Sequence, residues 1–310
     1  MRNMNLKDSA IYRIKLILPQ AIKSALDRLD EKTLDSINEL RLRSDGICTL
    51  TIGADNCVLT NSGITKDTAN GICVSPEEMD SFIFRLCKGS VYSYEPTLRD
   101  GYISRFGIRV GISGVYSPSA GNFTKIKSAN IRLPRHIPGC SADIMKYIKE
   151  HGFPNSRGIL ICSSPSVGKT TLLRDLAVNL SSCKAAGGLS KFYRVCVIDE
   201  RSEIFMENVF SDCACDFITG MPKYKGMETA TRVLSAEVMI CDEIGSAEES
   251  REILHARSGG VMLIASVHAN SLESALERPH IKMLLDEKVF GAVYTLERRG
   301  EKVTGTLNVL

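Results

Sequence analysis

From about residue 150 onward, short apolar segments alternate with stretches of helical character, and this rhythm limits the possible folds more than any other feature. The apolar segments are RGILIC (157–162), RVCVID (194–199), EVMIC (237–241) and VMLIASV (261–267). Strands that are apolar throughout and separated by helices form a parallel sheet covered on both faces. Such sheets bind ligands at the carboxyl ends of their strands. Functional side chains are therefore expected directly after these segments.

The first segment leads into a loop with the sequence of a phosphate-binding motif. Its residues are Ser163, Ser164, Pro165, Ser166, Val167, Gly168, Lys169, Thr170 and Thr171. A strand, this loop and a following amphipathic helix together make the Walker A pattern. The pattern predicts ATP binding, with loop amides and the helix N-terminus around the triphosphate. Lys169 is expected on the β- and γ-phosphates, and Thr170 is expected to offer its hydroxyl to Mg²⁺.

The loop departs from the Walker A pattern at two serines. Ser163 stands where the pattern begins with glycine, and Ser166 occupies a loop position where glycine is common. Glycine at such positions permits positive φ angles and close approach of the backbone to phosphate. A loop with serine in these places keeps two alternatives open, an active ATPase and a pseudo-ATPase that uses nucleotide only to fix its shape.

Two of the later segments end in an Asp-Glu pair, Asp199-Glu200 and Asp242-Glu243. In ATPases that have an additional strand beside the strand leading into the phosphate-binding loop, the aspartate that binds Mg²⁺ follows the third strand. The fourth strand then inserts between the first and the third and carries a polar sensor. We therefore assign Asp242 to Mg²⁺, Glu243 to activation of the attacking water, and His268 to sensing of the γ-phosphate. Glu200 is a second candidate base.

The N-terminal half has a different rhythm, typical of antiparallel strands. Spacing of apolar residues predicts an amphipathic helix over residues 7–30, and the Ser-Pro-Glu-Glu start predicts another helix over 75–88. Residues 101–132 alternate like meandering strands around a Pro/Ser/Gly turn. We expect a smaller α+β domain over 1–135. It precedes an α/β domain over 136–310 with a mostly parallel sheet and a RecA-like or AAA-type P-loop NTPase fold.

Composition argues against several other classes of protein. The net charge is only +3, tryptophan is absent and aromatic residues make up 6%, so a basic groove lined with aromatic residues for nucleic acid is not expected. Eleven cysteines, an odd number in a chain of 310 residues, do not suggest a disulfide framework and favour a reducing compartment. The sequence contains no run of about 18 apolar residues, so no transmembrane helix is predicted. We expect a cytoplasmic protein, or one attached to the inner face of the membrane through partners.

Several longer motifs extend over nearly the whole chain and are more specific than the loop. They include INELRLR (37–43), VIDERSEI (197–204), CDEIG (241–245) and the GGV…HAN run (259–270). With these motifs the sequence resembles the stage III sporulation protein AA family. These proteins are ATPases of endospore formers and are related to type II and type IV secretion ATPases.

The resemblance implies further roles for individual residues. It places Asp199, Glu200 and Glu203 in the segment known as the Asp box in secretion ATPases, and His268 in the segment known as the His box. It also implies a hexameric homo-oligomeric ring with ATP at the subunit interfaces. Arginine fingers would complete each site, and the candidates are Arg132, Arg135, Arg109 and Arg201.

The resemblance implies a biological role as well. Membrane proteins of the channel complex between mother cell and forespore would be the partners, and ATP hydrolysis would energise assembly of that complex or transport through it. The alternatives are a nucleic-acid-associated ATPase, since a related group joins this domain to single-strand-binding modules, and the pseudo-ATPase. Steeply salt-dependent binding of single-stranded DNA would favour the former alternative.

Overall fold

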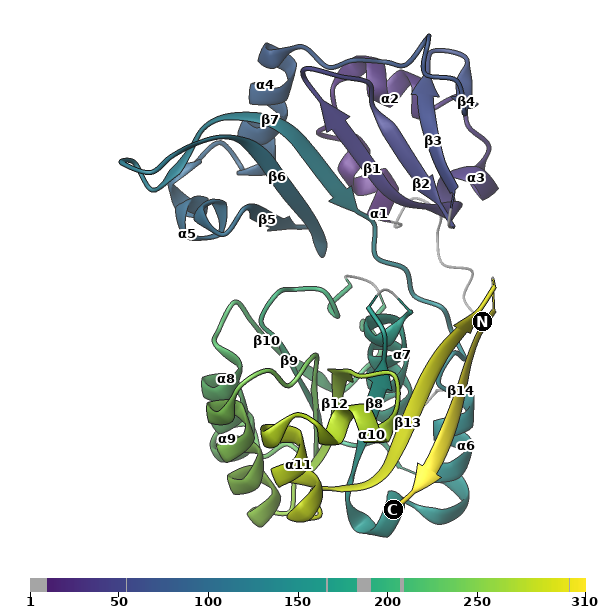
Figure 1. Cartoon of the computed structure of the whole chain (residues 1–310), viewed down its shortest axis with the longest axis vertical. Helices are drawn as coiled ribbons and strands as arrows, with labels where there is room; N and C mark the ends of the chain where they lie inside the picture. The colour runs from purple at the N-terminus through teal and green to yellow at the C-terminus, as the bar shows by residue number, and fades with distance from the viewer. Residues whose placement is uncertain (1–9, 54, 166, 183–190, 207–208, 301) are drawn as a thin grey trace. The chain divides into compact units, whose positions relative to one another are not determined.

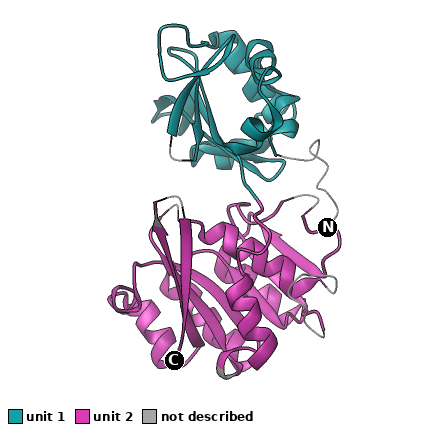
Figure 2. Cartoon of the chain, turned by 90° about the vertical axis from the view of Figure 1, so that its right-hand side faces the viewer, with its two compact units in different colours: residues 1–135 teal, residues 136–310 magenta. Residues whose placement is uncertain are grey.

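The computed structural model divides into two compact units, Met1–Arg135 and His136–Leu310, which Figure 2 shows in separate colours. Their elements are labelled in Figure 1. The structure describes residues 10–53, 55–165, 167–182, 191–206, 209–300 and 302–310. None of the helices in these ranges combines the length and the apolar character needed to cross a bilayer.

A seven-stranded antiparallel sheet with the order β4-β3-β2-β1-β7-β6-β5 forms the first unit together with short helices. Its strands are β1 (Ile37–Arg43), β2 (Thr49–Ile52), β3 (Asp55–Thr60), β4 (Gly63–Thr65), β5 (Tyr102–Arg105), β6 (Ile108–Ser117) and β7 (Asn122–Arg132). Its helices are α1 (Ala10–Lys15), α2 (Gln20–Leu26), α3 (Glu31–Ser36), α4 (Pro76–Leu86), the 3-10 helix η2 (Tyr92–Tyr94) and α5 (Glu95–Arg99). The mixed α+β character predicted for this part of the chain is confirmed.

The helix predicted over residues 7–30 is wrong as a single element. The described part of this range forms two short helices, α1 and α2, because Pro19 intervenes with an extended ψ of 146°. Proline has no N–H to donate and disfavours helical backbone in the residue before it. The helix predicted to start at Ser75 is confirmed, because Ser75 and Glu78 form a complete capping box at the start of α4.

A second seven-stranded sheet, with the order β10-β9-β11-β12-β8-β13-β14, forms the centre of the second unit. Its strands are β8 (Gly158–Ser163), β9 (Val195–Asp199), β10 (Cys215–Thr219), β11 (Val238–Cys241), β12 (Met262–His268), β13 (Phe290–Arg299) and β14 (Lys302–Val309). All neighbouring strands run parallel except β13 and β14, which pair antiparallel. The predicted α/β class with a mostly parallel sheet is confirmed.

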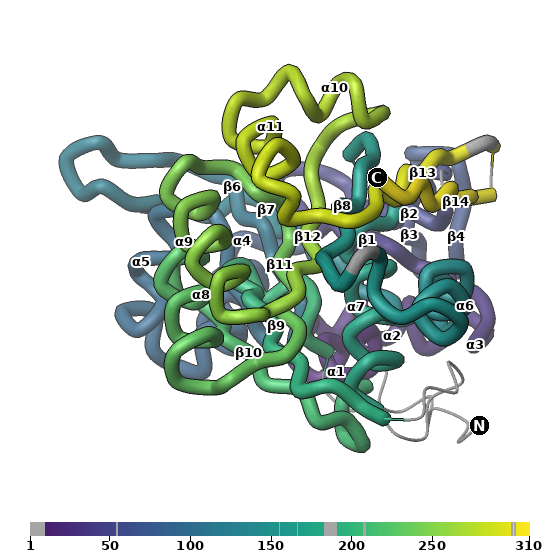
Figure 3. Tube along the Cα trace, turned by 90° about the horizontal axis from the view of Figure 1, so that it is seen from below, coloured from purple at the N-terminus to yellow at the C-terminus, as the bar shows by residue number. Residues whose placement is uncertain are grey.

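Helices cover both faces of this sheet, as Figure 3 shows along the strands. Residues that alternate along the central strands face two separate cores, one containing Leu160 and Met239 and the other Ile161 and Ile240. The first core includes residues of α8 (Lys223–Arg232), α9 (Ala247–Ser258), α10 (Leu272–Leu276) and α11 (Pro279–Asp286). The second includes residues of α6 (Ala142–His151), α7 (Lys169–Ser181) and the neighbourhood of the 3-10 helix η3 (Pro154–Ser156).

The strand order brings the carboxyl ends of three strands together. β12 lies between β8 and β11, which is the insertion of the fourth apolar segment between the first and the third expected from chain order. β10, an edge strand beside β9, was not predicted. Its sequence CDFIT is not apolar throughout, so it lacks the pattern of the buried strands. Its residues are partly or fully exposed, as an edge position allows.

Candidate nucleotide-binding site

The loop between β8 and α7 occupies the carboxyl end of the loop strand, where the sequence placed it. Ser163 is the last residue of β8 and is fully buried in extended backbone, so this position does not need the conformational freedom of glycine. Gly168 has a φ of 124° directly before α7, a conformation that favours glycine. Ser166 lies outside the described residues.

The Lys169 side chain lies inside the loop and is almost fully buried. Its Nζ is 3.1 Å from the Ser164 carbonyl oxygen and 2.7 Å from His268 Nδ1. The other ring nitrogen of His268, Nε2, lies 3.4 Å from Glu243 Oε2. Burial lowers the pKa of Lys169, and the nearby carboxylates of Asp242 and Glu243 act in the opposite direction. Lysine, histidine and glutamate thus form a continuous polar chain across the ends of β8, β12 and β11.

Beside this chain lies a pair of oxygen ligands. Thr170 Oγ1 donates a hydrogen bond to Asp242 Oδ2 at 3.2 Å, and Ser266 Oγ donates to Asp242 Oδ1 at 2.6 Å. A hydroxyl next to a carboxylate suits Mg²⁺, which prefers oxygen donors and takes only one or two carboxylates beside phosphate and water. The donor chemistry therefore fits the metal that the sequence predicts here.

Two residues that fix the Asp242-Glu243 pair were not predicted from the sequence. Ser266 is fully buried on β12 and also accepts a hydrogen bond from the Glu243 amide at 3.0 Å. A serine in an otherwise apolar strand is a signal that could have identified it. Lys223 donates to the carbonyl oxygens of Asp242 and Glu243. Nothing in the local sequence distinguishes Lys223 from the other lysines.

The other acidic strand end serves a different purpose. Asp199 is nearly fully buried and accepts hydrogen bonds of 2.8, 3.0 and 2.8 Å from the amides of residues 203, 204 and 205. Burial raises the pKa of Asp199 despite these hydrogen bonds. The buried Arg174 of α7 holds the same loop by donating its Nε to the Ile204 carbonyl at 2.7 Å. Asp199 thus anchors the loop that carries Glu200 and Arg201.

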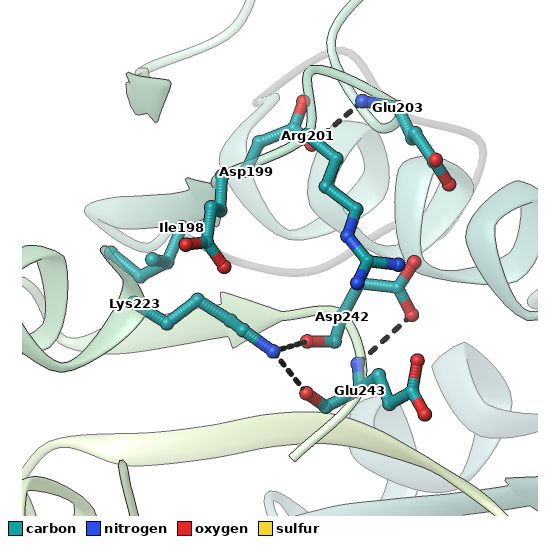
Figure 4. Close-up of a pocket in the computed structure, with 8 residues that line it drawn as sticks. Ile198, Asp199, Arg201, Glu203, Lys223, Asp242 and Glu243 are labelled. Atoms are coloured by element: carbon teal, nitrogen blue, oxygen red, sulfur yellow. Dashed lines mark hydrogen bonds between the residues drawn. The ribbon is translucent and has the colours of Figure 1, made fainter. Parts of the chain in front are cut away.

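A pocket opens between the ends of β9 and β11 (Figure 4). Its lining residues are Ile198, Asp199, Glu200, Arg201, Glu203, Lys223, Asp242 and Glu243. The structure therefore brings both candidate bases, Glu243 and Glu200, to one pocket. The predicted Asp box residues line it as well.

Of the four candidate arginine fingers, Arg201 lines this pocket. The other three belong to the first unit. There the Arg109 guanidinium lies 4.2 Å from the centre of the Tyr102 ring, and Arg132 Nε lies 3.5 Å from Glu39 Oε1. Arg135 is the last residue of that unit. Which arginine completes a nucleotide site stays a prediction.

The parallel sheet, its strand order and the loop before α7 define a P-loop NTPase fold. Two solved structures share it at a TM-score of 0.59 and 12% identity. The ATPase DotB of Legionella pneumophila is matched over 90% of this chain and 78% of its own. The pilus retraction motor PilT, solved with bound ADP, is matched over 90% and 81%. At this identity the likeness concerns the fold alone.

The family follows from sequence. The chain belongs to the sporulation stage III, protein AA family, whose model matches residues 7–308. Stage III sporulation protein AA of Bacillus subtilis is 32% identical over 292 residues, which cover 91% of this chain and 89% of the relative. The resemblance predicted from the sequence motifs is confirmed.

Proposed function

We propose that this chain binds ATP with Mg²⁺ and hydrolyses it to ADP and phosphate. One observation carries the proposal, namely the polar chain Lys169–His268–Glu243 beside the Thr170–Asp242 pair at the carboxyl ends of adjacent strands. Phosphoryl transfer needs a cation for the phosphates, oxygen ligands for a metal and a group that orients water. These side chains supply all three within one site.

Lys169 and His268 would exchange partners when a triphosphate binds. Since the Lys169 ammonium can only donate, His268 Nδ1 is the acceptor, and the proton of a neutral imidazole lies on Nε2, facing Glu243. A phosphate oxygen is a stronger acceptor than an imidazole nitrogen because it is charged. It would draw Lys169 away from His268, and the freed histidine could then respond to the γ-phosphate.

Thr170 and Asp242 would hold Mg²⁺ through their oxygens, with Ser266 keeping the Asp242 carboxylate oriented. The bound metal supplies neutralisation of charge on the β- and γ-phosphate oxygens.

Glu243 would act as the general base. Its carboxylate accepts a proton from water as the water oxygen bonds to the γ-phosphorus, while the bond from that phosphorus to the β,γ-bridging oxygen breaks and ADP leaves. Glu200 lines the adjacent pocket and is the second candidate.

Phosphate release by purified protein tests this proposal. We expect Glu243→Gln to keep ATP affinity within about threefold of wild type while turnover falls by more than about tenfold. Glu200→Gln is the matched control and should slow turnover less. If Glu200→Gln proves slower, the base is misassigned. If wild type releases phosphate no faster than Lys169→Ala, the chain is a pseudo-ATPase.

We further propose that hydrolysis energises assembly of, or transport through, the channel complex between mother cell and forespore. Family membership and the secretion-ATPase fold support this role. The chain would work in the cytoplasm as a homo-oligomeric ring attached to membrane proteins, with an arginine acting across subunits. Measuring the mass in solution with and without a non-hydrolysable ATP analogue tests the ring, and a monomer under both conditions would contradict it.

A further inference from the structure

The turn from Asp242 to Gly245 holds a glutamate in an unusual backbone conformation. Glu243 has a φ of 35°, which places it in the left-handed region that non-glycine residues rarely adopt. Such a conformation persists only where the surroundings fix it. The Glu243 amide donates to Ser266 Oγ at 3.0 Å, and the next two amides donate to the Ser266 carbonyl at 2.9 Å and to Glu249 Oε2 at 2.8 Å.

Lys223 fixes the carbonyl side of the same turn. Its Nζ donates to the carbonyl oxygens of Asp242, at 3.4 Å, and of Glu243 (Figure 4), and forms an ion pair with Glu249 Oε1 at 3.3 Å. An ammonium group has three N–H donors, which matches these three acceptors. The Lys223 and Glu249 side chains are only 15% and 11% exposed, so water competes little for these contacts.

Close packing of α8 on β9 brings Lys223 to the turn. Gly226 lies three residues later on the same helix, and a Cβ there would come within 2.9 Å of Ile198 Cγ2. The absence of a side chain at Gly226 lets the first turn of α8 approach the strand ends. Lys223 thus reaches the turn from a rigid element.

We propose that Lys223 is a positioning residue, which holds Glu243 in its left-handed conformation and so directs the Glu243 carboxylate toward His268, 3.4 Å away. The link to hydrolysis rests on the function proposed for Glu243 above. A side chain that fixes both carbonyls of the Asp-Glu pair controls where the carboxylate points without touching it.

The test compares Lys223→Met with Lys225→Met, an exposed lysine on the same helix. We expect Lys223→Met to lower kcat for ATP by more than about tenfold and to leave affinity for a non-hydrolysable analogue within about threefold. Hydrogen exchange in peptides that cover residues 243–245 should accelerate by about tenfold or more. Lys225→Met should match wild type in each measurement, and Lys223→Arg, which keeps the charge, should recover part of the loss.

Unchanged exchange of the turn in Lys223→Met would overturn the proposal, as would an equal loss of kcat and affinity with exchange rising throughout the second unit. The second result would mean that Lys223 only supports the fold. If Lys223→Met does not fold, the same criteria apply to Lys223→Arg, which should loosen the turn alone. Should wild type not hydrolyse ATP, the function proposed for Glu243 fails, and exchange of the turn by itself decides whether Lys223 positions it.

Discussion

Replacing Asp175 by asparagine should loosen the segment that begins the second unit. Asp175 lies on α7 and is 1% exposed. Its Oδ2 accepts hydrogen bonds from the Ser141 amide at 2.8 Å and the Ser141 hydroxyl at 2.6 Å. Its Oδ1 accepts from the Gly139 amide at 3.2 Å and lies 3.2 Å from His136 Nε2. One carboxylate thus fastens the segment from His136 to Ser141 to the helix that starts with Lys169.

The expected loss in the free energy of unfolding follows from the number of donors that Asp175 satisfies. Asparagine keeps one acceptor oxygen and turns an NH₂ group toward the two donors that faced the other oxygen. A hydroxyl can rotate and accept instead, but a backbone amide cannot. One unsatisfied buried donor costs about 1–3 kcal/mol, and hydrogen bonds to a neutral acceptor are weaker than those to a charged one. We expect the free energy of unfolding of the second unit to fall by about 3 kcal/mol.

The pH dependence gives a second check. Burial by itself would raise the pKa of Asp175, but the hydrogen bonds from His136, Ser141 and Gly139 outweigh it and hold the pKa below the ordinary value of 3.8. A lowered folded-state pKa adds stability that is present above 3.8 and is lost as the pH falls through the folded value. The difference between wild type and Asp175→Asn should therefore be constant near neutral pH and shrink in acid below 3.8.

Urea unfolding at a series of pH values measures both quantities, with the exposed Asp212→Asn as a control that should change stability by less than about 0.5 kcal/mol. An Asp175→Asn variant as stable as the control near neutral pH would contradict this role of Asp175. A difference from wild type that grows on acidification would contradict it as well.

Two further changes test the contacts around the site. Ser266→Ala removes a hydrogen bond to the Asp242 carboxylate, so stability should fall by about 1.5–3 kcal/mol and Mg-ATP affinity by roughly tenfold; calorimetry showing unaltered affinity would contradict the role of Ser266. Arg174→Met removes the donor to the buried Ile204 carbonyl and to the partly buried Glu203 carbonyl, so the free energy of unfolding should fall by about 3 kcal/mol. Hydrogen exchange should also accelerate at residues 203–205, and exchange that stays as slow as in wild type would show that Arg174 does not hold this loop.

The fold of the second unit was predictable because its signals are local. Each central strand is a short apolar segment, and the rule for inserted strands placed β12 between β8 and β11. The start of α4 was predictable for the same reason, since the Ser-Pro-Glu-Glu residues that mark it lie within one helical turn. Pro19 separates α1 from α2 although the apolar spacing continues across it. Periodicity alone therefore predicted a single helix that was too long.

The contacts of the candidate site were less predictable because they join residues far apart in the chain. Asp199 and Asp242 look alike in sequence, each ending an apolar strand before a glutamate. The structure separates them, since three amides of the following loop surround Asp199, whereas Asp242 faces Thr170 and Ser266. Lys223 reaches its acceptors only because α8 packs closely on β9, which no local pattern encodes.

Helix α7 carries buried polar side chains where a core helix would ordinarily carry leucine. Arg174 and Asp175 are 2% and 1% exposed, and each binds a different segment, the loop after β9 and the segment before α6. Buried charges rarely add net stability over apolar residues of similar volume, although removing one partner is costly. The hypothesis that follows is that these residues specify where the two segments lie relative to Lys169. An Arg174→Met variant that loosened residues 203–205 while nucleotide affinity and turnover stayed at wild-type values would count against it.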